Sequence, residues 1–349
     1  AISKVSGTLL RTFGIALPLL IHSSHPSHTI VIMKQVLTLA LGLFAAATLF
    51  AQEQAVYSQY PVYPVLVNPG YTGFEDQHQF LANVRSTWAG FPGRPNTYTL
   101  MYHGPVGDKL ALGGAIFSEK IGALNTLKLQ LNYAFRFQIQ KAKIGLGLTT
   151  EFLNRRLSND ALTDPNVQRG DDVLEANVDG QRIFDASVGT HILYDEKFFV
   201  SLAFTNTARV RLDAIAVASS ANDERNAFLG HSIFQLGYII ALPGQGIKVV
   251  PSLAVRKVRD TPTQIDVNLQ GRFMDDKLIT GITLRPSTGG SMALMVGTKY
   301  RKAQIYYSYD IAFGRFQSYS SGSHEFTVSY NIDRKKAAPK PGEESLNNN

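Results

Sequence analysis

The chain has 349 residues, no cysteine, 17% charged residues and a formal net charge of +7. The lack of cysteine excludes disulfides, thiolate zinc sites and catalysis by a thiol. The basic residues are scattered and form no stripe that alternates with aromatic residues, so nucleic acid is not an expected partner. Beyond residue 51, no stretch is apolar enough to predict a membrane-spanning helix.

The amino-terminal region has the pattern of a targeting sequence. Met33 and Lys34 form a basic start, residues 36–50 are apolar, and Ala51 supplies a small residue at a cleavage position. This order predicts a secretory signal peptide at 33–51, with a retained membrane anchor as the alternative. Residues 1–32 precede the first sensible initiator, and we expect them to be an upstream extension that is not native.

Residues 52–76 carry turn-forming motifs instead of strand periodicity. They contain Tyr57-Ser58-Gln59-Tyr60, then Pro64, then Asn68-Pro69-Gly70-Tyr71-Thr72-Gly73. Asn, Pro and Gly favour turns, and no strand requires these residues. We therefore predict a short non-strand segment that acts as a plug or as a periplasmic docking segment.

From residue 77 to residue 333, apolar and polar residues alternate. Within 127–139 the odd positions are all apolar or aromatic, and the even positions are polar apart from one alanine. A period of two places the two sets on opposite faces of a strand. Fourteen such segments are predicted, at 77–88, 96–104, 109–119, 124–139, 142–154, 182–194, 197–206, 229–242, 246–258, 262–274, 277–285, 290–301, 303–313 and 323–332.

The connections between these segments sort by length. Those after even-numbered segments are tight, such as Asp195-Glu196, whereas the two long ones, 155–181 and 207–228, follow odd-numbered segments. Outer-membrane barrels combine short periplasmic turns with longer outer loops, and lipid forces closure because it cannot satisfy a free sheet edge. The pattern predicts an all-β fold, a transmembrane antiparallel β-barrel of about 14 strands. A soluble β-rich protein is the alternative. Residues 334–349 predict a disordered tail.

The motifs before the first strand resemble the opening of the PorP/SprF family of type IX secretion and gliding-motility proteins. That family starts with a Phe-Ser-Gln-Tyr-like run, then a Pro, then Asn-Pro-Ala. Here Tyr57 replaces the first aromatic residue and Gly70 replaces the usual Ala. The resemblance resumes at the Arg, Trp and Pro around 85–92, at Ser308-Tyr309-Asp310 and at Gly322-Ser323-His324-Glu325. The tail is a departure, because family members commonly stop near the last strand.

The resemblance implies a non-enzymatic protein of the Gram-negative outer membrane that assists the secretion or surface anchoring of adhesins or other type IX cargo. Its implied partners are outer-membrane lipid, type IX secretion components and a secreted surface protein, with no cofactor and no identified small-molecule substrate. A porin-like or ligand-uptake channel is the alternative. The residues assigned to a partner or plug role are Tyr57, Ser58, Gln59, Tyr60, Asn68, Pro69, Gly73, Arg85, Trp88, Tyr309, Asp310, His324 and Glu325.

Several charged residues fall on the polar face of the predicted strands. They are Arg85, Lys128, Arg136, Glu151, Asp185, Arg256, Asp266, Arg272, Asp310 and Glu325. Opposite charges in a confined lumen can pair across strands and spare each other the cost of unpaired burial. We expect such structural pairing. The alternative is a solute pathway whose charges select ions.

Other motifs give weaker signals. Loop 155–181 is rich in carboxylates, yet its spacing does not match a calcium-binding loop, so we expect a solvated loop that faces a partner, with calcium as the alternative. His324-Glu325 lacks the second His of a zinc protease. Gly145-Leu146-Gly147 lacks a third glycine and predicts small residues that face the lumen. No nucleophile elbow is present, so an outer-membrane lipase or protease is a weak third hypothesis.

The aromatic residues have two interpretations. They can belong to the interfacial girdles that position a barrel in a bilayer, or they can contact a partner from a loop. The candidates are Trp88, Tyr60, Tyr63, Tyr98, Tyr102, Tyr300, Tyr306, Tyr307, Tyr309 and Tyr330.

Overall fold

The structure is a computed structural model that describes residues 57–158, 180–212, 231–258, 261–286, 290–313 and 320–334. These residues belong to one compact unit, 47–349. Its elements are η1 (Pro64–Leu66), η2 (Pro69–Tyr71), β1 (Gln77–Ser86), β2 (Asn96–Pro105), β3 (Leu110–Ile121), β4 (Leu124–Ile139), β5 (Ala142–Leu157), β6 (Gln181–Tyr194), β7 (Phe198–Phe204), β8 (Val210–Arg211), β9 (Ser232–Tyr238), β10 (Ile240–Leu242), β11 (Ile247–Lys257), β12 (Gln264–Phe273), β13 (Leu278–Arg285), β14 (Ser291–Tyr300), β15 (Ala303–Ala312) and β16 (Ser323–Asp333). Within the described residues, no helix has both the length and the apolar composition needed to cross a membrane.

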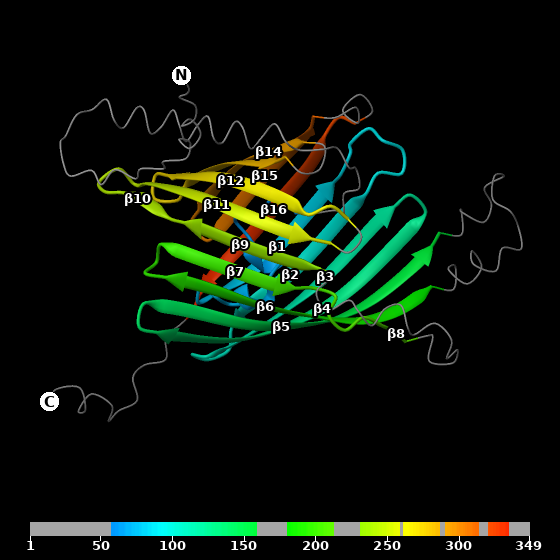
Figure 1. The fold of residues 1–349 in the computed structure, drawn as a ribbon, viewed down its shortest axis with the longest axis horizontal. Coiled ribbons are helices and arrows are strands. Elements are labelled where there is room, and N and C mark those ends of the chain that lie inside the picture. Colours follow the sequence, from blue (N-terminus) through cyan, green and yellow to red (C-terminus); the bar gives the residue numbers. More distant parts are fainter. Residues whose placement is uncertain are drawn as a thin grey trace, which may run out of the picture. The chain divides into compact units, whose positions relative to one another are not determined.

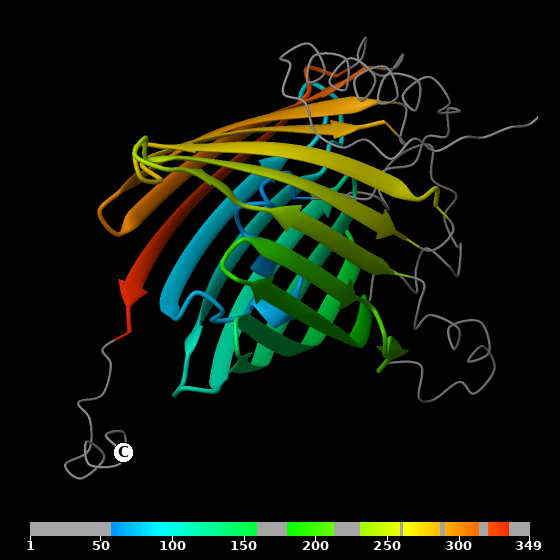
Figure 2. The ribbon, with the colours of Figure 1, turned by 60° about the vertical axis from the view of Figure 1, so that its left-hand side comes forward.

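The strands close into a ring in which every neighbour is antiparallel (Figures 1 and 2). The first strand pairs with the last, since Gln77 lies opposite Asp333 and Ser86 lies opposite His324. The ring closes again where β9 pairs with β11. β9 and β10 together make one strand of the barrel, which is interrupted at Ile239. The two-residue β8 pairs with β6 and is not one of the strands that form the closed ring. The prediction of a 14-stranded barrel is therefore confirmed.

The faces of the barrel are inverted relative to those of a water-soluble protein. On β4, Leu129 and Leu131 are each 49% exposed, whereas Asn132 is 1% exposed and Arg136 is 4% exposed. The apolar side chains thus cover the outside of the ring and the polar ones line its lumen. This is the arrangement that a strand crossing lipid requires.

The predicted sorting of the connections is also confirmed. The short turns 106–109, 140–141, 195–197, 243–246, 274–277 and 301–302 all follow the strands that end at the same rim. We refer to that rim as the turn end and to the opposite rim as the loop end. In one tight turn Asp195 and Glu196 both have positive φ, near 51° and 55°, and the N–H of Lys197 donates to the carbonyl of Tyr194. Two central residues with positive φ give a turn whose twist matches that of the flanking strands. Most of the two predicted long loops lies outside the described residues.

Residues 57–76, here named the lumen segment, run inside the barrel (Figure 2). The hydroxyl of Tyr57 contacts that of Thr99 near the loop end, and Asp76 lies at the turn end beside Arg334. Two 3₁₀ turns shape the path between these points. η2 begins after Asn68, whose side-chain oxygen accepts the N–H of Gly70, and Pro69 occupies the first position, where a missing N–H costs nothing.

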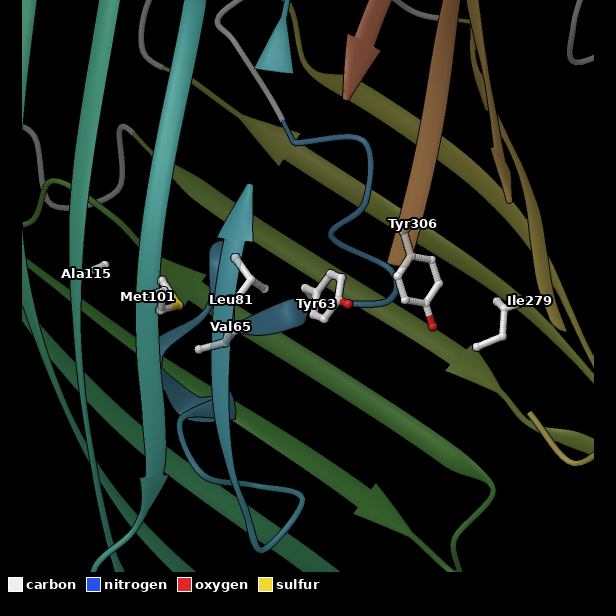
Figure 3. Packing of buried hydrophobic residues seen from close by; sticks show 7 residues of the cluster. All are labelled: Tyr63, Val65, Leu81, Met101, Ala115, Ile279 and Tyr306. Carbon is white, nitrogen blue, oxygen red and sulfur yellow. The ribbon is translucent and has the colours of Figure 1, made fainter. Parts of the chain in front are cut away.

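A small apolar core joins the lumen segment to the wall. Tyr63 and Val65 pack with wall residues, and the rings of Tyr63 and Tyr306 meet edge to face at 5.4 Å (Figure 3). The wall residues of this cluster are Leu81, Met101, Ala115, Ile279 and Tyr306. The assignment of Tyr60, Tyr63 and Tyr306 to a lipid-facing girdle is wrong, because they are at most 2% exposed and lie in the lumen.

Glycines allow the lumen segment to approach one part of the wall. Gly145 and Gly147 face inward on β5, and a Cβ on Gly147 would overlap the carbonyl of Pro69. A Cβ on Gly189 of β6 would overlap the side chain of Asn68. The prediction that Gly145 and Gly147 are small lumen-facing residues is confirmed, and the close backbone approach supplies the physical reason.

Candidate functional site

A buried ion cluster surrounds the start of the lumen segment, where the segment lies against β1, β15 and β16. Arg85 contacts Asp310 at 2.7 Å and Glu325 at 2.9 Å. Ser58 joins both carboxylates, because its N–H donates to Glu325 at 2.7 Å and its hydroxyl donates to Asp310. Asn83 donates to the other oxygen of Glu325. The lumen segment is thus held by charge-assisted hydrogen bonds, which are about twice as strong as neutral ones.

A second part of the cluster surrounds Tyr60. Its hydroxyl donates to Asp266 at 3.0 Å and accepts from the amide of Asn268. Burial raises the pKa of Tyr60 above its ordinary value, and the nearby Asp266 carboxylate acts in the same direction. The hydroxyl therefore keeps its proton and acts as a donor. Arg256 lies 3.7 Å from Asp266 and over the Tyr60 ring.

Arg285 connects the two parts of the cluster. It lies 3.3 Å from Asp310 and 3.6 Å from Asp266, and it also donates to the hydroxyl of Ser58. Together the cluster, here named the ion cluster, contains Arg85, Arg256, Arg285, Asp266, Asp310 and Glu325. Its three positive and three negative charges balance, as burial requires.

The second anchor of the lumen segment lies on the opposite wall. The side-chain amide of Asn68 donates to the carbonyl of Thr190 at 2.8 Å and to the hydroxyl of Ser201 at 2.6 Å. Asn68 is 2% exposed and also caps η2. Its amide therefore satisfies both the turn and the wall.

A third anchor fixes the segment at the turn end. The N–H of Gly73 donates to a ring nitrogen of His103 at 3.1 Å, and Arg136 donates to the carbonyl of Gly73. Arg136 also pairs with Asp76 at 3.2 Å. The anchors together connect the segment to strands on all sides of the ring.

A cavity of about 550 Å³ lies between the lumen segment and the loop end. We name it the mouth cavity. Tyr57 and Leu66 of the lumen segment line it from below, and inward side chains of β1 to β6 line its sides. A smaller cavity of about 210 Å³ lies on the other side of Trp88, next to Arg85 and Asp310. Trp88 borders both cavities and has a positive φ near 56°, which is a rare conformation for a bulky residue.

The structure brings some of the predicted site residues together and separates others. Tyr57, Ser58, Gln59, Tyr60, Arg85, Asp310 and Glu325 meet at the ion cluster or beside it. Asn68, Pro69 and Gly73 lie at the other two anchors. Tyr309 and His324 are not part of either group: Tyr309 donates to the carbonyl of Ser321, and His324 contacts the hydroxyl of Tyr307. His324 and Glu325 are consecutive in a strand, so they face opposite sides and cannot share a metal.

The predicted pairing of lumen charges is present at Arg85, Lys128, Arg136 and Arg256. Arg285 was missed, although it has the same inward parity as the buried Thr283 two positions earlier. That parity is the signal that could have found it. Among the described residues, no group of three His, Cys, Asp or Glu side chains converges to hold a metal. The acidic part of loop 155–181 lies outside the described residues.

A closed antiparallel ring with an apolar exterior and a polar interior defines an outer-membrane type of β-barrel protein. A family model described as type IX secretion system membrane protein PorP/SprF matches residues 49–330. The chain belongs to this family.

Solved outer-membrane structures also match the chain, at low identity and low TM-scores. The outer membrane protein Omp33 of Acinetobacter baumannii matches at 7% identity and a TM-score of 0.44, over 74% of this chain and 99% of that chain. The Pseudomonas putida toluene transporter TodX matches at 9% identity and a TM-score of 0.42, over 81% and 95%. A Pseudomonas aeruginosa FadL homologue matches at 10% identity and a TM-score of 0.42, over 76% and 92%. These likenesses carry no inference about a ligand. No curated protein sequence matches the chain.

Proposed function

We propose that the protein is a plugged outer-membrane component of the type IX secretion machinery, which assists the secretion or surface anchoring of adhesins or other cargo. Family membership supports the secretion system as its context. The observation that carries the proposal is the lumen segment, which is anchored to β6 and β7 on one wall and to β12, β15 and β16 on the other. A barrel filled in this way offers a rigid platform rather than a passage.

In this proposal the signal peptide 33–51 exports the chain, the turn end faces the periplasm and the loop end faces the exterior, as in other barrels of this type. The lumen segment holds the barrel closed, and the loop end meets the secreted partner. No catalytic step is assigned to any residue. The competing function is a porin-like or ligand-uptake channel, for which the mouth cavity is the favouring observation.

The test is surface display of type IX cargo in cells that lack this protein. We expect the displayed cargo, measured by protease shaving and mass spectrometry, to fall in the absence of the protein and to return with the full chain. A chain without residues 57–76 should insert but fail to restore display.

Two controls keep this test interpretable. Heat-modifiable migration in gels reports whether the shortened chain still forms a folded barrel. Asp195→Asn, at an exposed turn, should restore display fully. Unchanged cargo display in cells without the protein would refute the proposed function.

A further inference from the structure

Three basic side chains share the outer surface of the barrel at the loop end. They are Arg94, Lys120 and Arg156, all of them exposed, and we name them the cation belt. Lys120 and Arg156 face outward, because the residue before each of them lines the mouth cavity and successive residues of a strand face opposite sides. Arg94 is held on the same surface by a hydrogen bond of 2.9 Å from its Nε to the outward hydroxyl of Ser86.

The strand register brings the members of the cation belt close together. Lys120 of β3 lies opposite Asn125 of β4, and Asn125 lies opposite Arg156 of β5. The backbones of Lys120 and Arg156 are therefore about 10 Å apart, twice the spacing of neighbouring strands. Two side chains of this length can reach one group between them. Arg182 of β6, one outward position deeper, extends the same basic surface.

Hydrogen bonds between the loop-end connections hold the cation belt in place. The N–H of Gly122, in the β3–β4 turn, donates to the carbonyl of Gly93 at 2.9 Å. The N–H of Ser158, just after β5, donates to the carbonyl of Ala123 at 2.7 Å. The segment that carries Arg94, the turn after Lys120 and the end of β5 are thus joined directly, so the three cations are fixed relative to one another.

The outer surface around the cation belt holds no balancing carboxylate in the described residues. Between β1 and β6, each described carboxylate either faces the lumen or lies in a turn at the other rim. Those that face the lumen are Glu119, Glu151 and Asp185, and those in the turns are Asp108, Asp195 and Glu196. On the described part of β9 to β16, Lys257 is the one outward lysine or arginine at the loop end. The positive charge is therefore concentrated over β2 to β6.

The cation belt lies just beyond the apolar band of the barrel. Each member is four residues past the last exposed apolar residue of its strand, and these residues are Tyr98, Ile116 and Phe152. Four residues cover about 13 Å along a strand, or about 10 Å along the membrane normal at the usual tilt of a barrel strand. The headgroup layer begins where the hydrocarbon ends and is about 5–8 Å thick. Long basic side chains bend back far enough to enter it.

We propose that the cation belt binds the phosphate group of an anionic lipid in the leaflet that meets the loop end, with the acyl chains against the apolar surface of β2 to β5. Charge complementarity selects the phosphate, because guanidinium and ammonium groups bind phosphate oxygens through charge-assisted hydrogen bonds. The continuity of the belt with the apolar band selects a lipid over a free anion. Binding of this kind does not depend on the secretion role.

The test measures lipid binding to the full chain in a neutral detergent by native mass spectrometry. The probes are dioleoyl phosphatidic acid, dioleoylglycerol, which has the same chains without the phosphate, and glycerol 3-phosphate, which has the phosphate without the chains. We expect saturable binding of phosphatidic acid, about a hundredfold tighter than that of dioleoylglycerol, which corresponds to roughly 1 kcal/mol for each basic residue. Glycerol 3-phosphate should not compete at the concentrations that saturate the lipid.

A charge-matched pair of variants locates the site. The variant Arg94→Gln, Lys120→Gln, Arg156→Gln should lose the preference for phosphatidic acid over dioleoylglycerol. The control Lys257→Gln, Arg301→Gln, Lys302→Gln removes the same charge from three exposed positions elsewhere, and it should keep the preference. Heat-modifiable migration reports whether each barrel is folded. If the triple variant does not fold, each single substitution should weaken binding of phosphatidic acid by about fivefold.

Three results would overturn the proposal. Equal binding of phosphatidic acid and dioleoylglycerol would remove the role of the phosphate. Competition by glycerol 3-phosphate would make the site one for a free anion. An equal loss of the preference in both triple variants would mean that the net charge of the protein attracts the lipid without a site. Cargo display in cells is measured separately, so failure of lipid binding and failure of the proposed function are distinguishable.

Discussion

Asp310 is the residue at which the lumen segment and the barrel wall are joined most tightly. It accepts from the hydroxyl of Ser58 and contacts two guanidinium groups, Arg85 and Arg285. The single negative charge of Asp310 cannot balance both guanidinium groups, and the carboxylates of Glu325 and Asp266 supply the rest. The ion cluster therefore behaves as one unit, and removal of one member leaves an uncompensated buried charge.

Asp310→Asn tests this balance. The variant keeps the shape of the side chain but leaves Arg85 and Arg285 with one carboxylate fewer. We therefore expect the free energy of unfolding of the barrel to fall by about 3–5 kcal/mol. The measurement is the midpoint of the heat-dependent gel shift of the purified barrel. Asp108→Asn is the matched control, because the Asp108 side chain is 92% exposed, and its midpoint should not change. An unchanged midpoint with altered conductance in Asp310→Asn would instead support a solute pathway.

Strand periodicity predicted which of these residues face inward, but not which of them meet. Arg85, Asp310 and Glu325 have inward parity in three predicted strands, and those strands are neighbours in the ring. The partners of Ser58 and Tyr60 could not be predicted, because the lumen segment has no strand periodicity that would show which way each side chain points. Their contacts depend on the path of the chain across the lumen, which only packing determines.

Among the elements, the strands were the most predictable. Thirteen of the fourteen strands of the barrel are continuous, with bounds close to those predicted. They were predictable because lipid on one face of a strand and polar groups on the other enforce a strict alternation of apolar and polar residues. The interruption at Ile239 between β9 and β10, in the fourteenth strand, was not predicted. Its N–H donates to the carbonyl of Lys197 in the neighbouring turn, a contact that alternation alone does not show.

The lumen segment is the element whose position depends on close packing. Next to η2, the carbonyl of Pro69 lies where a side chain on Gly147 would be. Gly147→Ala should therefore displace η2 or strain the wall. We expect the free energy of unfolding to fall by about 1–3 kcal/mol, the range for overpacking. The readouts are the heat-shift midpoint and cleavage of the segment by added chymotrypsin, which should increase.

Gly114→Ala is the control for this substitution. Gly114 is also a strand glycine, but the nearest atom to an added Cβ is 3.5 Å away. Replacing glycine in a strand without a clash lowers the entropy lost on folding, so stability should be equal or slightly higher. Equal behaviour of the two variants would contradict the close approach of η2 to the wall.

For the whole molecule, closure follows from a single constraint. A spanning sheet must pair its first and last strands because lipid leaves any edge unsatisfied, and β1 and β16 do so along the full length of β1. The count of strands and the sorting of turns could thus be predicted from the sequence. The sequence predicted residues 52–76 as either a plug or a periplasmic docking segment and could not decide between the two, because a barrel of this size is compatible with either a polar channel or a plug.

Single-channel recording decides between those states. The native barrel should conduct poorly, because the lumen segment contacts opposite walls at the ion cluster and at Asn68. Deletion of 57–76 should raise the conductance roughly tenfold or more, since a ring of about 14 strands is closer to the open porins than to the filled eight-stranded barrels. Gly114→Ala should conduct like the native chain. A native conductance equal to that of the deletion would mean that the segment leaves the lumen open, and the platform role would then give way to that of a channel.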